Sequence, residues 1–126
     1  MKSHNVVVDT ITTITITMVN VVKAIVTAVK KIYGNHLKQV ILYGSYARGD
    51  YTKDSDVDIM LLVDLDETEL DTFSDALSEL GFEYNVEHDI WMMPIVKNKK
   101  SFLRWSEAYP FYKNVKTEGI SLYEAA

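Results

Sequence analysis

The sequence has 126 residues, of which 48% are hydrophobic, enough for one compact core and too few for two ordinary domains, so we expect a single domain over 1–126. It contains no cysteine, which excludes disulfides and thiolate metal sites. The sequence has no clean apolar leader and no run long enough to span a bilayer, so we expect a soluble, cytoplasmic protein without membrane association.

The net charge of -5 is unevenly distributed along the chain. Fourteen of the 18 acidic residues lie between Asp50 and Asp89, where Lys53 is the only Lys or Arg, whereas Lys and Arg dominate 97–116. An acidic middle argues against a general nucleic-acid binder, which needs a basic face. A solvated acidic helix beside ordinary basic surface accounts for most of this asymmetry.

The first predicted element is a helix over 10–33. Its many β-branched residues favour a strand, but the apolar positions from Ile11 to Ile32 recur at steps of three and four, which is typical of one helical stripe. Asp9 or Thr10 could cap its start, and Gly34 its end.

Further elements follow in quick succession. The runs "QVILYG" and "VDIMLLV" predict two strands within 38–63, joined by a loop rich in Gly and Asp. "DETELDTFSDALSELG" predicts an acidic amphipathic helix over 66–80. We expect a strand over 83–93 and helices within 98–118. The order α β β α β α predicts a small mixed α/β (α+β) domain, with a mixed sheet flanked by helices.

Two aspartates stand at the head of the second strand. Asp56 and Asp58 are two residues apart, so both should point to one face, while Val57 and Ile59 point into the core. Like charges this close repel each other unless a cation lies between them or one carries a proton. Mg²⁺ takes hard oxygen ligands and is usually held by one or two carboxylates together with substrate phosphates.

The loop "GSYARG" could bind those phosphates. Gly44 permits a tight turn and close approach of a ligand, Ser45 offers a hydroxyl and a backbone N–H, and Arg48 offers charge. The loop is not a Walker A motif, because the G-K-[ST] ending is missing. Alone, a Gly-Ser turn or a D-x-D pair is most often an ordinary turn or loop edge; their combination at one end of adjacent strands is more specific.

The segment "GSYARGDYTKDSDVD" resembles the signature of the nucleotidyltransferase superfamily of DNA polymerase beta, a Gly-Ser turn followed by Asp-x-Asp. The ten-residue gap is similar to that of its minimal (MNT) branch. The leading helix ending "KKIYG", the acidic helix and the closing "PFYKNVKTEGISLYE" also resemble this group, so the resemblance covers nearly the whole chain. It implies a polymerase-beta-like nucleotidyltransferase core.

The family pattern implies a third carboxylate on a following strand. "VEHDIW" offers Glu87 and Asp89, and Asp89 fits the pattern better because apolar residues follow it. A strand-edge acid without catalytic function is the alternative for either residue. His88 should point away from that face, and no Ser-His-Asp arrangement or histidine metal-ligand spacing supports a hydrolase.

The resemblance implies attack of a hydroxyl on the α-phosphate of a nucleoside triphosphate, with ATP as the expected substrate. Asp56 and Asp58 would hold two Mg²⁺ ions, and Asp89 would complete the metal site and help to remove the hydroxyl proton. Gly44 and Ser45 would bind the β- and γ-phosphates. Arg48 would either add charge there or pair with a nearby acid.

The resemblance also implies a partner. Members of the MNT branch are commonly paired with a HEPN-domain ribonuclease toxin, which they neutralise by transferring AMP to one of its tyrosines, so we expect an antitoxin that forms a hetero-oligomer. Trp105, Tyr109, Phe111 and Tyr112 could dock that partner, although Phe102, Trp105 and Tyr109 could instead form the inward stripe of the last long helix. A small-molecule, aminoglycoside-type nucleotidyltransferase and a binding-only antitoxin with an idle site remain the alternatives.

Overall fold

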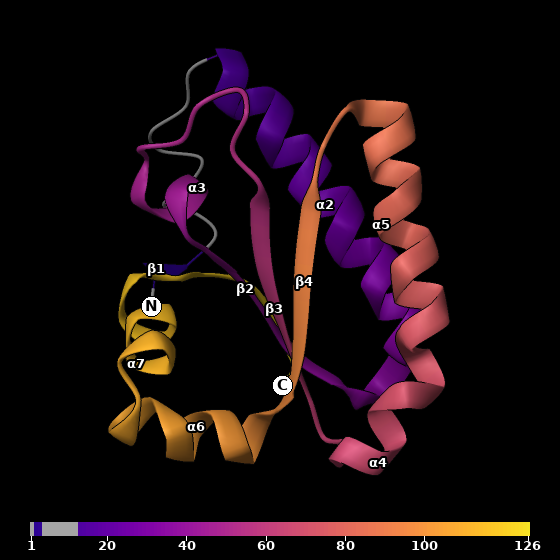
Figure 1. Ribbon diagram of the computed structural model, residues 1–126, viewed down its shortest axis with the longest axis vertical. Helices are drawn as coiled ribbons and strands as arrows, with labels where there is room; N and C mark the ends of the chain where they lie inside the picture. The colour runs from indigo at the N-terminus through magenta and orange to yellow at the C-terminus, as the bar shows by residue number, and fades with distance from the viewer. Residues whose placement is uncertain (1, 4–12) are drawn as a thin grey trace.

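A five-stranded mixed sheet forms the centre of the protein in a computed structural model that describes residues 2–3 and 13–126 (Figure 1). The strand order is β1-β5-β2-β3-β4. β2 (Leu37–Tyr43) and β3 (Val57–Val63) pair antiparallel at the centre, and β4 (Met92–Asn98) lies parallel to β3. The mixed sheet with flanking helices confirms the predicted fold class.

The other edge of the sheet is built from the two ends of the chain. β5 (Ile120–Glu124) pairs antiparallel with β2, and the two-residue β1 (Lys2–Ser3) pairs parallel with β5. Neither strand is predicted from the sequence. β5 follows Gly119, where a side chain would collide with Ile41 and the backbone of Val115, so glycine allows the chain to turn closely against β2.

β3 is buried on both faces and divides the core in two. Ile59, Leu61 and Val63 face one apolar cluster, and Met60 and Leu62 face the other. This alternation follows from the two-residue period of a strand. A strand covered on both sides is expected to be continuously apolar, as "VDIMLLV" is after its single carboxylate.

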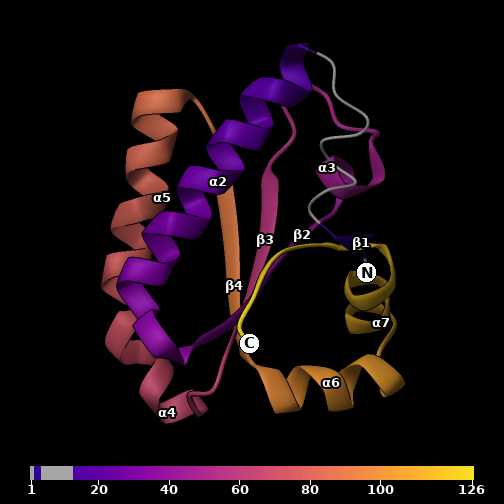
Figure 2. The same ribbon diagram turned by 180° about the vertical axis from the view of Figure 1, so that it is seen from behind.

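Helices α2 (Thr13–Tyr33) and α5 (Ser74–His88) lie side by side over the first cluster (Figure 2). Ile25 and Val29 of α2 are fully buried there, so the helical stripe prevails over the β-branched composition, as predicted. Gly34 ends the helix with a positive φ of 58°. The predicted start at 10–12 and the caps Asp9 and Thr10 lie outside the described residues.

The acidic segment after β3 is longer than predicted. Asp66 caps α4 (Glu67–Leu70) through a capping box with Glu69. A short 3-10 turn, η2 (Asp71–Phe73), follows, and α5 then continues through Gly81 to His88. The expected stop at Gly81 is wrong, because Leu77 and Leu80 before it and Tyr84 after it all pack in the first cluster at helical spacing.

The strand predicted over 83–93 is therefore wrong in most of its length. Residues up to His88 are helical, Asp89 is the left-handed C-cap of α5 with φ 54°, and β4 begins only at Met92. Asp tolerates this left-handed conformation better than most residues do. The pattern "FEYNVEHDIW" offered apolar residues that suit either state, and burial of Tyr84 decides in favour of the helix.

The predicted C-terminal helices within 98–118 are confirmed. Asn98 caps α6 (Lys99–Ala108), and Pro110 is the first residue of α7 (Pro110–Glu118), which suits its missing N–H. Phe102 and Val115 from these helices complete the second cluster under Met60 and Leu62. Among the described helices, none is long and apolar enough to cross a membrane.

Candidate functional site

Gly44 brings the loop after β2 directly against β3. Tyr43, the last residue of β2, pairs with Asp58 of β3. Gly44 then has φ 75° and ψ -152°, a conformation nearly restricted to glycine, and α3 (Ser45–Arg48) follows. A Cβ on Gly44 would overlap the Asp58 carboxylate. Glycine is thus required here both for the backbone conformation and for the space that Asp58 occupies.

Asp56 and Asp58 lie at the start of β3, as the sequence predicts. Val57 and Ile59 are buried in the first cluster, so Asp58 points to the opposite face of the sheet, which α6 and α7 cover. Burial raises the pKa of Asp58, the nearby Asp56 carboxylate raises it further, and the Arg48 charge partly offsets both effects. The ionised pair is therefore disfavoured until a cation neutralises it.

The carboxylate pair suits a hard divalent cation. Two oxygen donors that repel each other, one half-buried and one exposed, are the kind of set that holds Mg²⁺ while substrate phosphates and water complete the coordination. Gly44 leaves room for the Asp58 carboxylate beside the loop. Asp56 and Asp58 are the residues that would hold the cation.

A cleft of about 450 Å³ opens beside Asp58. One side consists of the loop after β2, with Gly44, Ser45 and Arg48, and the other side consists of α7. Tyr43 also lines the cleft, and burial, followed by the charge of Asp58, raises the pKa of Tyr43 to about 12. The residues predicted to bind phosphate and one of the predicted metal ligands thus share a single cavity.

Arg48 takes part in both of the arrangements expected from the sequence. Its Nε donates to Asp50 Oδ2 at 3.3 Å, an exposed ion pair that contributes little to stability. The same residue lines the cleft, where its charge lowers the pKa of Asp58. A surface pair of this kind can be exchanged for a substrate phosphate at small cost.

Asp89 and Glu87 do not join the aspartate pair. Glu87 is an exposed residue of α5, and Asp89 is its exposed C-cap. Among the described residues, no three His, Cys, Asp or Glu side chains converge closely enough to hold a metal. The strand residue aligned with Asp58 on β4 is Met93, which is 48% exposed. On the neighbouring strand a thioether, and not a carboxylate, therefore lies opposite Asp58.

Helix α7 supplies residues that the sequence analysis did not assign to the site. Phe111, Asn114, Val115 and Glu118 all line the cleft. Their spacing of three, four and seven residues marks one face of a helix. That pattern is visible in the sequence, but only the tertiary placement of α7 against β2 shows that this face meets the Gly-Ser loop.

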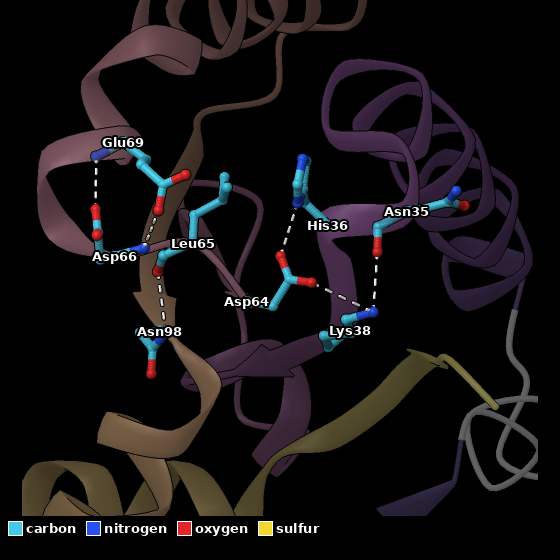
Figure 3. A network of polar contacts seen from close by, with 8 residues as sticks. All are labelled: Asn35, His36, Lys38, Asp64, Leu65, Asp66, Glu69 and Asn98. Carbon is cyan, nitrogen blue, oxygen red and sulfur yellow. Dashed lines mark hydrogen bonds and ion pairs between the residues drawn. The ribbon is translucent and has the colours of Figure 1, made fainter.

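The opposite end of β3 carries a different polar cluster, shown in Figure 3. Asp64 accepts from His36 Nδ1 at 2.8 Å and pairs with Lys38 Nζ at 3.6 Å. The hydrogen bond from His36 holds the pKa of Asp64 below its usual range. Nearby, Asn98 donates to the Leu65 carbonyl at 3.0 Å. These contacts join η1 (Gly34–His36), β2 and β4 at the end of the sheet away from the cleft.

Comparison with known proteins agrees with this geometry. A family model described as a nucleotidyltransferase domain matches residues 22–117. A protein of Methanocaldococcus jannaschii named "Putative protein adenylyltransferase MJ0604" is 38% identical over 105 residues, which cover 81% of this chain and 94% of that relative. Another from the same organism, "Putative protein adenylyltransferase MJ0141", is 33% identical over 84 residues, 65% of this chain and 81% of the relative.

A solved structure has the same fold. It is the crystal structure of a mutant of the toxin-antitoxin pair MntA-HpeT, with a TM-score of 0.54 and 20% identity over 82% of this chain and 73% of that one. At this level of identity the likeness shows the fold alone, and it agrees with the predicted fold class, a mixed sheet flanked by helices. Since the family model covers most of the sequence and includes the Gly-Ser loop, the aspartate pair and α7, the chain belongs to the nucleotidyltransferase domain family.

Proposed function

We propose that this protein transfers AMP from ATP to a tyrosine hydroxyl of a partner protein. The observation that supports the proposal is the close approach of Gly44 to Asp58 in one cleft, because a Gly-Ser loop suits phosphates and a carboxylate suits a metal ion. The relatives named as protein adenylyltransferases support AMP as the transferred group and a protein as the acceptor.

In the proposed reaction, the tyrosine oxygen forms a bond to the α-phosphorus of ATP. The bond from that phosphorus to the oxygen bridging to the β-phosphate breaks, pyrophosphate leaves with the electron pair, and the hydroxyl proton passes to water. Ser45 and Arg48 bind the leaving phosphates and keep the α-phosphate in line with the acceptor.

Asp56 and Asp58 hold Mg²⁺ in this proposal. The bound metal would neutralise charge on the phosphates and on the attacking and leaving oxygens, and two ions, as the family resemblance implies, would do so from both sides. Asp89 has no support as a third ligand, because it lies on the exposed end of α5. The chain's own contribution is thus two carboxylates and the Gly-Ser loop.

We further propose that the partner is a HEPN-domain toxin that AMP transfer silences. The resemblance of "GSYARGDYTKDSDVD" to the MNT branch supports this. The solved structure of the same fold supports it too, because that structure is of a toxin-antitoxin pair. The partner must bring its tyrosine to the mouth of the cleft, so its contact surface should adjoin α7.

An aromatic cluster across α6 and α7 provides such a surface. The ring of Tyr112 lies 5.4 Å from that of Trp105 and 5.1 Å from that of Phe111, and contacts Phe102 and Tyr109 edge-on. Phe102 is fully buried, as the inward-stripe interpretation requires, whereas Tyr109 is 56% exposed. Exposed aromatics held by their neighbours are typical centres of protein interfaces.

The proposal is tested by incubating the purified protein with ATP, Mg²⁺ and the HEPN protein encoded beside it. A mass gain of one AMP on a tyrosine of that protein is expected. Neutralisation without any mass change would instead indicate an antitoxin that acts by binding alone. Transfer to an aminoglycoside and to no protein would indicate a small-molecule enzyme.

A further inference from the structure

Helix α7 forms a wall of the cleft with a composition different from that of the loop opposite. The loop side carries the polar groups of Ser45 and Arg48, and Arg48 is the only basic residue among those lining the described cleft. The α7 side carries Phe111, Asn114 and Glu118. This inference rests on the proposed function, in which the cleft holds a nucleoside triphosphate.

The charges orient such a nucleotide in the cleft. Phosphates are attracted by Arg48 and by a metal at Asp58, and they are repelled by the Glu118 carboxylate on α7. The uncharged nucleoside must therefore lie along α7 while the triphosphate lies along the loop. The residues of α7 are then the ones that contact the base.

Phe111 offers a surface on which a base can stack. Its ring contacts Tyr43 edge-on, with centroids 5.8 Å apart and planes at 84°, and contacts Tyr112 at 5.1 Å and 74°. The side chain remains 45% exposed although these two rings hold it in place. Stacking on an aromatic ring strengthens nucleotide binding but is tolerant of base identity.

Asn114 is the only amide side chain that lines the described cleft, and it lies one helical turn from Phe111. An amide carries a donor and an acceptor side by side, which matches the N6 and N7 edge of adenine. Guanine presents two acceptors, O6 and N7, on the same edge, so one of them would face the amide oxygen.

We propose that α7 is the base-recognition element of this protein, with Phe111 stacking on the base and Asn114 selecting adenine over guanine. A well-formed pair of hydrogen bonds to a base edge gives about fivefold discrimination or more. The wild-type protein should accordingly bind Mg²⁺-ATP at least about fivefold more tightly than Mg²⁺-GTP.

The experiment is calorimetric titration of the full chain with ATP and with GTP, each with Mg²⁺. Asn114→Leu should bring the two dissociation constants within about twofold of each other, because leucine has similar size but no hydrogen-bonding groups. Phe111→Ala should weaken both nucleotides by about fivefold or more and leave their ratio unchanged. Lys113→Ala is the control, because Lys113 is an exposed residue of α7 that does not line the cleft. It should change neither the dissociation constant for ATP nor that for GTP.

An unchanged ratio of ATP to GTP affinity in Asn114→Leu overturns the inference, and so does a wild-type protein that binds both nucleotides equally. In either case Mg²⁺-dependent nucleotide binding would still stand, and with it the proposed transfer. A wild-type protein that binds neither nucleotide would instead refute the proposed function itself. The two failures are thus distinguished in one set of titrations.

Discussion

Gly44 lies so close to the Asp58 carboxylate that a Cβ at position 44 would overlap a carboxylate oxygen. Gly44 belongs to the loop that should bind the triphosphate, and Asp58 to the pair that should bind its metal. Because Gly44 has no side chain, the backbone of the loop can approach the side chain of Asp58 closely. The backbone conformation of Gly44, with φ 75° and ψ -152°, independently excludes other residues.

Gly44→Ala should therefore abolish Mg²⁺-dependent ATP binding and lower the free energy of unfolding by about 1–3 kcal/mol. Alanine would displace the loop or rotate Asp58 away from the cleft. Gly49→Ala is the matched control: it also has a positive φ, 85°, but has nothing within 4 Å of the added methyl group. It should lower stability while ATP binding persists in calorimetric titration. Loss of ATP binding in both variants would show that strain, and not the contact, is responsible.

Asp58→Asn should raise the melting temperature of the metal-free protein at neutral pH. Burial and Asp56 raise the pKa of Asp58, so the folded protein holds this proton more tightly than the unfolded chain does. The stabilising effect of the protonated form is fully present below the unfolded pKa and is lost as the pH rises through the raised folded pKa. Asparagine has no charge at any of these pH values, so the variant does not lose this stability as the pH rises.

The gain in melting temperature should accordingly shrink to nothing at low pH, where the Asp58 carboxyl is neutral in both states. Differential scanning calorimetry across about pH 3 to pH 8 with a chelator measures this dependence. Asp54→Asn, at an exposed loop position, is the control and should show no such pH-dependent gain. A gain that is constant with pH would contradict the electrostatic explanation.

Asp89→Asn should change the rate of AMP transfer by less than about threefold, whereas loss of a group that accepts the acceptor's proton costs about 10² or more. The reason is its position at the exposed C-cap of α5. Asp89→Gly should make the protein more stable by about 1 kcal/mol, because glycine adopts the left-handed φ of 54° without strain. A loss of about 10² in Asp89→Asn would restore the third-carboxylate prediction.

Tyr109→Ala should weaken binding of the protein partner by about tenfold or more without changing Mg²⁺-ATP affinity. The proposed contact surface lies on the α6–α7 aromatic cluster, where Tyr109 is exposed and packs edge-on against Tyr112. Phe82→Ala is the control, since Phe82 is an even more exposed aromatic but lies on α5. Equal effects of both substitutions in surface plasmon resonance would place the interface elsewhere.

The parts of this molecule that local pattern determines could be predicted from the sequence. Three features depend only on residues close together in the sequence: the apolar stripe of α2, the apolar run of β3, and the short spacing between Gly44 and the aspartate pair. The structure places them as expected. The Gly-Ser loop and Asp58 share a cleft because adjacent strands bring them to one end of the sheet.

The parts that depend on tertiary contacts could not be predicted. Gly81 is an ordinary stop signal, but contacts of Leu80 and Tyr84 with the core continue the helix beyond it and move Asp89 off the sheet. The sequence of β5 does not by itself indicate a strand, because this segment is stabilised by its pairing with β2. Asn114 and Glu118 become site residues only because α7 packs beside the Gly-Ser loop.

Mass spectrometry of the neighbouring HEPN protein, after incubation with this protein, ATP and Mg²⁺, tests the central claim most directly. The account predicts a gain of one AMP on a tyrosine with the wild-type protein. It predicts no gain with the double variant Asp56→Asn and Asp58→Asn, which should remain folded because the paired negative charges are removed. An equal gain of AMP with the double variant, or neutralisation of the partner without AMP on any of its residues, would contradict it.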